Sequence, residues 1–390
     1  MAYSAQKTPK FEPNKFPNRL MRYNWQQRDW PHFRFDLRGV ESQLLTYLQK
    51  TALLNGMLLA LPEALRQEAV VDLMTMEALK TSAIEGEYIS RQDVQSSIRN
   101  HLGLNTPPEA VTDLRARGLG QMMAAVRQTF ATTLSADMLF DWHHLLLGDR
   151  ADLGVVGGWR QHTEPMQIIS GALGKERVHF EAPPSSAVPA LMDGFIGWFN
   201  QTSLSHSDSK FPPVRAALAH LWFESIHPFE DGNGRIGRAI AEKSLSQGLG
   251  APVPFSLSLA IEGDRKAYYQ ALEHAQQSNE VTGWLAYFIP ATLVALEKAE
   301  AEIVFIVRKA KFFDRFRDVL NDRHWKVIRR MLEAGSDGFQ GGMDARKYSA
   351  LTGASKATAT RDLQYLQQLG ALVVSGGGRS TRYGVGLEGG

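Results

Sequence analysis

The chain has 390 residues and a formal net charge of +2, and its 44% hydrophobic and 22% charged residues are typical of a folded protein of two or three domains. The absence of cysteine excludes a disulfide framework, thiol catalysis and cysteine-based zinc sites. No stretch approaches the about 18 consecutive apolar residues that a membrane span requires, and the basic N-terminus precedes no apolar run, so we expect a cytoplasmic protein without an export signal or a membrane partner.

The predicted elements are mostly helices. Residues 1–37 include the aromatic-rich run YNWQQRDWPHFRFD, which lacks helical periodicity, so we expect an extended or irregular segment. From about residue 38 to 310, apolar residues recur at helical spacing, as in ESQLLTYLQKTALLNGMLLAL and VRAALAHLWFESI. One exception is MQIISGALGKERVHF, Met166 to Phe180, whose two β-prone runs around a glycine-containing loop predict a β-hairpin.

The last segment, from about residue 321, has a different pattern. Three helices, the third being ATATRDLQYLQQLG, precede two strands in ALVVSGGGRSTRYGV, an order that predicts a winged helix-turn-helix. Residues 321–390 hold ten Lys/Arg against six Asp/Glu, a net charge of +4. Because the whole chain carries +2, the rest of the chain has a net charge of about −2. The basic side chains that could meet a phosphate backbone are Lys347, Lys356, Arg361, Arg379 and Arg382. Winged helices also serve as dimerisation or protein-docking modules, so DNA, a protein partner and a homodimer all remain open.

The stretch IHPFEDGNGRIGR, Ile226 to Arg238, carries the strongest chemical signal. Its helical flanks predict a helix–loop–helix connection, with the second helix beginning near Asn233 or Gly234, rather than the hairpin turn that DGNG would otherwise favour. Gly232 and Gly234 allow the backbone to aim N–H groups into a nest, and the positive end of the new helix adds to them. The pattern therefore indicates a phosphate cradle.

Charged side chains around this cradle supply the remaining chemistry. Arg235 and Arg238 are three residues apart on one helix face and can reach neighbouring phosphates. Asp231 offers a hard oxygen ligand suited to Mg²⁺. His227 stands just before the cradle, where an imidazole can take a proton from an incoming hydroxyl at neutral pH. Together these residues point to transfer of a nucleotide phosphate.

The string HPFEDGNGRIGR resembles the signature of the Fic (filamentation induced by cAMP) family, HPFx[DE]GNGRxxR, at every fixed position. The resemblance implies a mainly α, Fic-type helical domain and a protein adenylyltransferase, which moves AMP from ATP to a Ser, Thr or Tyr hydroxyl of a protein, itself included. It makes His227 the general base, Phe229 the anchor of the loop and Asp231 the Mg²⁺ ligand. The residues that it places on the phosphates are Gly232, Asn233, Gly234, Arg235 and Arg238.

Two further segments gain a meaning from this resemblance. The hairpin from Met166 to Phe180 stands where the family has a flap that holds an extended target segment by strand addition, although a simple surface hairpin is the alternative. The segment RKAYYQAL stands where the family has a helix with an aromatic residue for the adenine. Tyr268 and Tyr269 are both candidates, and either could instead belong to the core.

Upstream, KTSAIEGEYIS contains Thr81, Glu85 and Gly86 in the arrangement [ST]xxxE[GN], which resembles the inhibitory helix of the family. Thr81 and Glu85 are four apart and share a helix face, so the hydroxyl could steady the carboxylate. The resemblance implies that Glu85 pairs with Arg238 and takes it from the γ-phosphate, in the class that carries this helix on the N-terminal side. In some members the same glutamate positions a water that removes AMP again.

These observations predict an N-terminal extension with the inhibitory helix in residues 1–110, a catalytic domain in 111–310, and a linker helix with the winged helix in 311–390. The leading function is an autoinhibited protein adenylyltransferase that uses ATP and Mg²⁺. The alternative is a DNA-binding regulator with a nucleotide-responsive Fic domain. We expect His143 and His144 to be one core and one surface histidine with no metal role, because no carboxylate lies at ligand spacing beside them.

Overall fold

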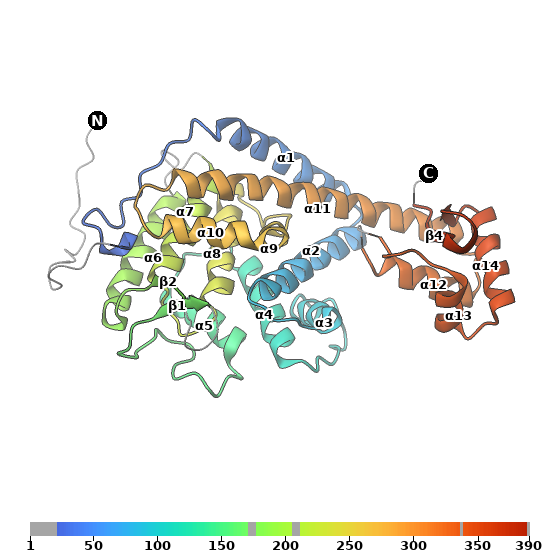
Figure 1. Ribbon diagram of the computed structural model, residues 1–390, viewed down its shortest axis with the longest axis horizontal. Helices are drawn as coiled ribbons and strands as arrows, with labels where there is room; N and C mark the ends of the chain where they lie inside the picture. The colour runs from blue at the N-terminus through green and yellow to red at the C-terminus, as the bar shows by residue number, and fades with distance from the viewer. Residues whose placement is uncertain (1–21, 171–176, 205–210, 336–337, 388–390) are drawn as a thin grey trace. The chain divides into compact units, whose positions relative to one another are not determined.

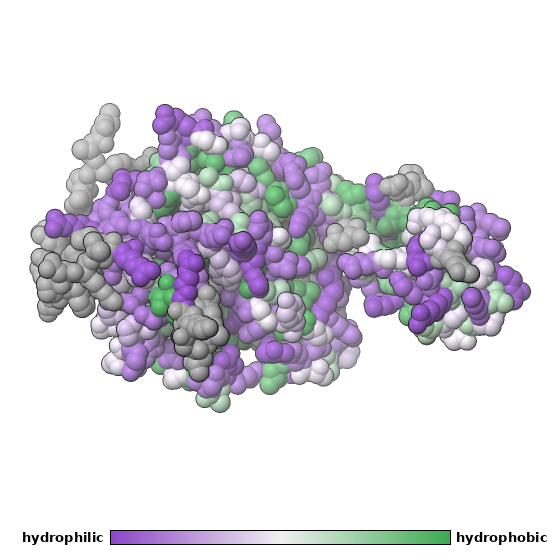
Figure 2. Space-filling model, viewed as in Figure 1, coloured by the Kyte–Doolittle hydropathy of each residue, from purple (hydrophilic) through white to green (hydrophobic). Residues whose placement is uncertain are grey.

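The computed structural model describes residues 22–170, 177–204, 211–335 and 338–387. The chain is mainly helical, as predicted, with two small antiparallel hairpins (Figure 1). The first 21 residues and the tip of the predicted flap, 171–176, lie outside the described residues. Within the described ranges, no helix combines the length and apolar character needed to cross a membrane. The face visible in Figure 2 is mainly hydrophilic, in keeping with helices that bury their apolar side.

The elements follow one another in an almost unbroken series of helices. In chain order the helices are η1 Asn24–Gln26, α1 Glu41–Ala60, α2 Glu63–Ile84, α3 Arg91–His101, α4 Leu114–Gln128, α5 Ala136–Leu147, η2 Ser185–Ala187, α6 Val188–Leu204, α7 Pro212–Ile226, α8 Asn233–Leu249, α9 Leu257–Gly263, α10 Arg265–Ala275, α11 Thr282–Phe316, α12 Asp322–Leu332, α13 Ala345–Thr352, α14 Lys356–Gln368 and η3 Gly378–Ser380. The strands are β1 Gln167–Ser170, β2 Arg177–Glu181, β3 Leu372–Ser375 and β4 Arg382–Val385. Many of the helices begin where a polar side chain accepts a backbone N–H, as Ser90, Ser135 and Asp264 do.

The chain divides into two compact units. Unit 1 comprises Met1–Leu53 and Val71–Leu296, and unit 2 comprises Leu54–Val70 and Glu297–Gly390. The predicted domain boundaries near residues 110 and 310 stay predictions.

Helix α7 is the central helix of unit 1. All of its residues except Leu218 are buried, and these include the polar side chains Arg215, His220, Glu224 and Ser225. Pro212 and Pro213 suit its first turn, where backbone N–H groups lack intrahelical partners. It packs most extensively against α8, whose inward side chains Ile236 and Ile240 are fully buried. The loop 227–232 between these two helices is therefore held at both ends by the core of unit 1.

The predicted hairpin is present as β1 and β2, which pair antiparallel with a register shift between Ile168 and Ile169. Figure 1 shows it as a small strand pair on an otherwise helical unit 1. Two side chains of β2 contact α10: Arg177 Nη2 donates to Glu273 at 2.8 Å, and His179 Nδ1 lies 3.0 Å from the same carboxylate. These contacts tie the base of the hairpin to the body of unit 1.

The irregular N-terminal segment packs against the hairpin as well. Tyr23 and Trp25 form an apolar cluster with Phe180, and the rings of Tyr23 and Phe180 meet edge-on at 5.1 Å. Trp25 Nε1 donates to the carbonyl of Glu181 at 2.7 Å. Asn24 Nδ2 donates to Ser225 Oγ in α7 at 2.9 Å. The segment therefore joins β2 to the helix that ends at the central loop.

Unit 2 contains the predicted order of three helices followed by a hairpin. Helices α12, α13 and α14 precede β3 and β4, and Met343 forms a further bridge with Tyr383. Lys356 and Arg361 are exposed on α14, as contact with DNA would require, whereas Lys347 Nζ donates to the carbonyl of Gly342 at 2.8 Å. The side chain of Arg379 lies outside the description. Contact with DNA stays a prediction.

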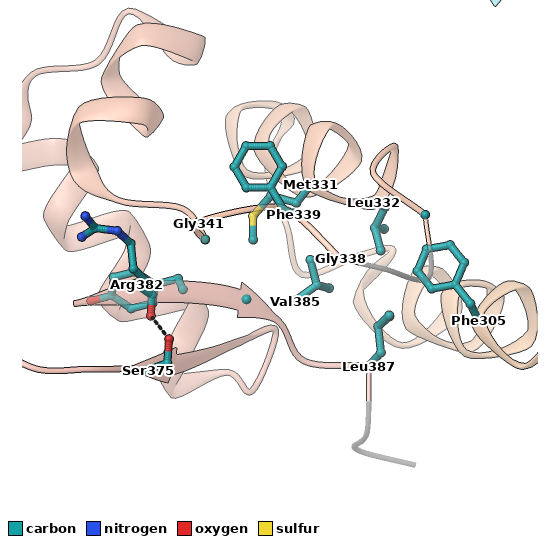
Figure 3. A pocket seen from close by; sticks show the side chains of 14 residues that line it. Phe305, Met331, Leu332, Gly338, Phe339, Gly341, Ser375, Arg382, Val385 and Leu387 are labelled. Carbon is teal, nitrogen blue, oxygen red and sulfur yellow. Dashed lines mark hydrogen bonds between the residues drawn. The ribbon is translucent and has the colours of Figure 1, made fainter. Parts of the chain in front are cut away.

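A cavity of about 580 Å³ opens in unit 2 between α11, α12, the loop 338–342 and the hairpin. Figure 3 shows Phe305, Leu332, Val385 and Leu387 gathered on one side of it, whereas the Arg382 guanidinium points away from them. The Arg382 guanidinium lies 3.9 Å from Asp344, so its charge is already balanced nearby. The lining is mainly apolar, and the guanidinium of Arg382 does not point toward the apolar side chains.

Candidate active site

The central loop begins with an unusual backbone at His227. Helix α7 ends at Ile226, and His227 has φ 51° and ψ 61°, the left-handed region that a residue with a Cβ adopts only at a cost. Its N–H donates to Phe223 O at 2.9 Å and its carbonyl accepts from Arg160 Nε at 2.8 Å. Arg160 is buried, and this burial lowers the pKa of its guanidinium to about 10. These bonds hold the imidazole at the start of the loop, with the side chain 13% exposed.

Phe229 anchors the loop in the core, as the resemblance implies. Its ring is fully buried and stacks on His143 at 4.2 Å with an interplanar angle of 12°. Asn233 holds the Phe229 backbone from both sides, since its Oδ1 accepts from the N–H at 3.0 Å and its Nδ2 donates to the carbonyl at 2.8 Å. The Asn233 amide therefore shapes the loop, and its backbone N–H is what remains for a phosphate. His143 is buried and His144 is exposed, as predicted.

The predicted cradle lies where α8 begins. Gly232 has φ 80° and caps α8, a conformation that favours glycine. A Cβ on Gly234 would lie 2.2 Å from Glu85 Oε1. The carboxylate of Glu85 therefore lies against the backbone of the first turn of α8, where the helix dipole and free N–H groups favour an anion.

Arg238 joins the predicted inhibitory segment to the cradle. Its Nη2 donates to Glu85 Oε1 at 2.6 Å, and its Nε donates to Thr81 Oγ1 at 2.7 Å. Arg238 is 1% exposed and Glu85 is 30% exposed. Burial acts to lower the pKa of Arg238, but the Glu85 carboxylate raises it well above its usual value. Thr81 thus meets Glu85 through the shared arginine, and its hydroxyl binds Arg238 rather than steadying the carboxylate directly.

The other arginine of the motif also has an acidic partner. Arg235, 4% exposed on its side chain, donates from Nη1 to Glu87 Oε2 at 2.8 Å, and its Nη2 lies 3.5 Å from Asp231 Oδ1. Glu87 follows Glu85 by two residues, so one short segment contacts both arginines that were expected to hold phosphates. Sequence reasoning missed Glu87, although a second carboxylate in IEGEY was a visible signal.

The two carboxylates of the motif have different environments. Glu230 Oε2 accepts the N–H of Gly154 at 2.8 Å and so belongs to the scaffold of the loop. Asp231 is 39% exposed, its Oδ1 accepts the N–H of Gly232 at 2.6 Å, and its Oδ2 lies 3.2 Å from Arg150 Nη1. The described residues contain no group of three or more His, Cys, Asp or Glu placed to hold a metal. One exposed carboxylate nevertheless suits Mg²⁺, which is commonly bound through one or two carboxylates together with substrate phosphates.

The structure separates the two tyrosines proposed for the adenine. Tyr268 is 1% exposed, and its hydroxyl lies 2.8 Å from His220 Nε2 inside the core. Tyr269 is 42% exposed and donates from its hydroxyl to the carbonyl of Ile84 at 3.2 Å, next to Glu85. Tyr269 is therefore the tyrosine that lies at the edge of the site.

One buried carboxylate near the base was not foreseen. Glu224, on the last turn of α7, is 3% exposed, and its Oε2 lies 3.7 Å from His227 Nδ1. Burial by itself raises the pKa of Glu224, but His227, His220 and Arg238 lower it more, and the resulting pKa is below the usual value. Its spacing of three residues from the histidine, on one helix face, was the signal in the sequence.

Two family models match the chain. Residues 133–245 match the model described as the Fic/DOC family, which includes the whole central loop. Residues 23–104 match a domain of unknown function, DUF4172, which includes Thr81 and Glu85.

Curated relatives share the same part of the chain. A protein adenylyltransferase Fic from Drosophila virilis is 28% identical over 155 residues, which cover 36% of this chain and 31% of the relative. One with the same name from Drosophila ananassae is 31% identical over 121 residues, covering 30% and 22%. The match thus spans only about a fifth to a third of the length of these relatives. The crystal structure of a Fic family protein from Desulfovibrio desulfuricans shares the fold, with a TM-score of 0.51, 18% identity, and coverage of 91% of this chain and 98% of that one.

Proposed function

This chain is a Fic family protein through its residues 133–245, and from that membership we propose that it is an autoinhibited protein adenylyltransferase that transfers AMP from ATP to a protein hydroxyl. The observation that carries the proposal is the Glu85 carboxylate, which lies against Gly234 at the start of α8 and 2.6 Å from Arg238. An anion from the chain itself thus lies where a nucleotide phosphate is expected. A site that already favours a carboxylate has the charge and the N–H donors to bind phosphate.

The reaction follows from the residues of the loop. The oxygen of the target hydroxyl attacks the α-phosphorus of ATP, and His227 accepts the proton that the hydroxyl loses. The bond between the α-phosphorus and the oxygen that bridges to the β-phosphate breaks, and pyrophosphate leaves in line with the attack. Backbone N–H groups of Asn233 and Gly234, with Arg235 and Arg238, hold the β- and γ-phosphates, while the N–H of Gly232 stays with Asp231. The protein contributes position and positive charge.

Magnesium fits the donor set at Asp231. Its partly exposed carboxylate forms an ion pair with Arg150, whose Nη1 lies 3.2 Å from Asp231 Oδ2. The metal would replace this contact. Bound through Asp231 and the phosphates, Mg²⁺ supplies charge neutralisation of the leaving pyrophosphate. Glu230 is committed to the N–H of Gly154, so we assign no metal contact to it.

Inhibition in this proposal is a competition for Arg238. While Arg238 binds Glu85 and Thr81, it is withheld from the γ-phosphate, and ATP is left without the clamp that aligns its α-phosphorus. Departure of Glu85 from the cradle restores the clamp. The same carboxylate could position a water for removal of AMP from a modified hydroxyl, which would make the enzyme reversible.

Incubation with differently labelled ATP tests the proposal. Label at the α-phosphate should appear on protein, and label at the γ-phosphate should not, because the β- and γ-phosphates leave together. The purified chain with Glu85→Gly would serve as the enzyme, with label on its own hydroxyls as the readout and no kinase present, and the same variant with His227→Ala would be the control. Transfer of the γ-label, or equal α-labelling by the His227→Ala control, would overturn AMP transfer by this site.

A further inference from the structure

We propose that Glu224 is a positioning residue for His227: it holds the proton of the imidazole on Nδ1, so that Nε2 is the nitrogen that accepts the proton of the target hydroxyl. This role rests on the proposed function for its use in catalysis. The tautomer of the His227 imidazole can be measured without any transfer of AMP.

The geometry carries the first step. Glu224 Oε2 lies 3.7 Å from His227 Nδ1, too far for a hydrogen bond, but no other group among the described residues forms a hydrogen bond with Nδ1. Glu224 Oε1 likewise has no hydrogen-bond partner in the described part of the chain. A shift of about 0.7 Å would bring Glu224 Oε2 within hydrogen-bond distance of His227 Nδ1 and give this buried nitrogen its missing partner. Catalytic hydrogen bonds are often long before substrate binds.

The backbones that carry the two side chains are both fixed in the core of unit 1. Glu224 belongs to the rigid, buried α7, while His227 is fixed by its N–H bond to Phe223 and by the bond from Arg160 to its carbonyl. The backbones of Glu224 and His227 are therefore both held by the core of unit 1. Only side-chain torsions need to change to close the remaining distance.

The surroundings keep Glu224 charged, and a charged carboxylate is the form that only accepts a hydrogen bond, here from Nδ1–H. Three titratable or charged groups act on Glu224. They are His220 on the same helix, His227 directly after that helix, and Arg238 on α8. Tyr268 lies beyond His220, and Glu85 lies beyond Arg238. Arg238 Nη1 has no hydrogen-bond partner among the described groups, so part of this buried cation is available to balance Glu224. A buried carboxylate next to the imidazole also stabilises the imidazolium that forms during transfer.

Gly237 gives an independent sign that the space around Glu224 is restricted. A Cβ at this position would lie 2.5 Å from Glu224 Oε1 and 3.1 Å from His220 Nδ1. Position 237 is one of the two variable positions in the GNGRxxR half of the motif. The contact therefore belongs to the packing of this chain, and Gly237→Ala should push Glu224 from its place without altering its charge.

The experiment measures the imidazole directly and the reaction separately. Nitrogen NMR of the full chain with ¹⁵N-labelled histidine identifies the His227 signals by their loss in His227→Ala. We expect the parent to show a protonated Nδ1 and a bare Nε2, and Glu224→Ala to show a mixture of tautomers. Glu224→Gln keeps the shape of the side chain and serves where the alanine variant unfolds. The matched control is Glu242→Gln, another carboxyl with an unpartnered oxygen in unit 1.

The reaction gives the second measurement, made in the Glu85→Gly background. Glu224→Gln and Gly237→Ala should each slow transfer by about 10- to 100-fold, by analogy with partners that orient metal-binding histidines. Each should also alter the pH profile of transfer at unchanged ATP affinity. The control Glu242→Gln should change neither the rate of transfer nor its pH profile. An unchanged His227 tautomer in both Glu224 variants would overturn the positioning role. If no variant transfers AMP but the tautomer changes, the proposed reaction fails and the positioning role stands.

Discussion

Replacing Glu85 by glycine should accelerate transfer. The change removes the carboxylate that Arg238 Nη2 contacts at 2.6 Å and empties the space against Gly234. Glu85 follows the last residue of α2, so glycine there interrupts no helix. Arg238 keeps its bonds to the hydroxyl and the carbonyl of Thr81 and stays near the cradle. Its Nη1, and the Nη2 hydrogen that had bound Glu85, are then the donors left for the γ-phosphate.

The size of the effect follows from the strength of the contact. A hydrogen bond between charged groups contributes about 1.5–3 kcal/mol, and each 1.4 kcal/mol is a factor of ten in population. Glu85 is 30% exposed, so solvent screening places the contact at the lower end of that range. We therefore expect the fraction of molecules with a free Arg238, and the initial rate of self-labelling, to rise by about 10-fold.

Self-labelling with α-labelled ATP, at matched Mg²⁺, compares the parent with three variants, Glu85→Gly among them. Glu85→Gln, which keeps an acceptor but loses the charge, should give an intermediate rate. Glu85→Gly combined with Arg238→Ala should lose the gain, because the clamp itself is absent. Glu85→Gly should also melt at a lower temperature than the parent, because a buried cation loses its partner, and ATP should raise its melting temperature more.

One pair of results would refute the reasoning. If Glu85→Gly labels no faster than the parent while both bind ATP equally, Glu85 does not restrain Arg238. If the variant that also carries Arg238→Ala keeps the full gain, the acceleration comes from a general loosening of unit 1 instead.

Four further predictions concern the same unit. His227→Ala should abolish transfer yet leave ATP affinity nearly unchanged in titration calorimetry, because the imidazole takes a proton and need not hold the nucleotide; an equal loss of affinity would contradict this role. Asp231→Ala should leave a low residual rate that no longer responds to Mg²⁺, whereas a retained Mg²⁺ dependence would place the metal elsewhere. Glu87→Gln should raise ATP affinity by freeing Arg235, which is paired at 2.8 Å, and the gain should add to that of the Glu85 variant; no change in affinity would make the pair purely structural. Burial, with a smaller contribution from a neighbouring carboxylate, raises the pKa of Glu242 to about 8, so the free energy of unfolding should fall by up to about 1.4 kcal/mol per pH unit between about pH 5 and 8, and Glu242→Gln should remove that slope in urea titrations.

Local pattern was enough for most of the elements. Helical spacing predicted the mainly α architecture, and two β-prone runs around a glycine loop predicted the hairpin that forms β1 and β2. The start of α8 at Asn233 also followed from the sequence, because glycine before a run of helix-forming residues is a local signal. Each of these features depends on residues within a few positions of one another, where backbone sterics and side-chain spacing decide the conformation.

The contents of the loop could likewise be read from residue types. A histidine, an aspartate, glycines and two arginines within one short string suffice to indicate a phosphate site, because their chemistry does not depend on distant partners. The tertiary structure decided which of the two adjacent carboxylates, Glu230 or Asp231, is accessible to a metal. Glu230 is bound to Gly154, whereas Asp231 stays partly exposed.

The fold decides which residues far apart in the chain meet; the family resemblance implied the pair of Glu85 and Arg238, but no local pattern did. Glu85 and Arg238 are 153 positions apart, and Glu87 and Arg235 are 148 apart, so their pairing depends on the fold bringing the segment after α2 to the start of α8. Helical spacing alone suggested that Thr81 would contact Glu85, but the buried guanidinium of Arg238 offers stronger donors and takes both oxygens. A sequence shows which groups are available for pairing, and burial of a charge decides which of them must pair, because an unpaired charge in the core is too costly.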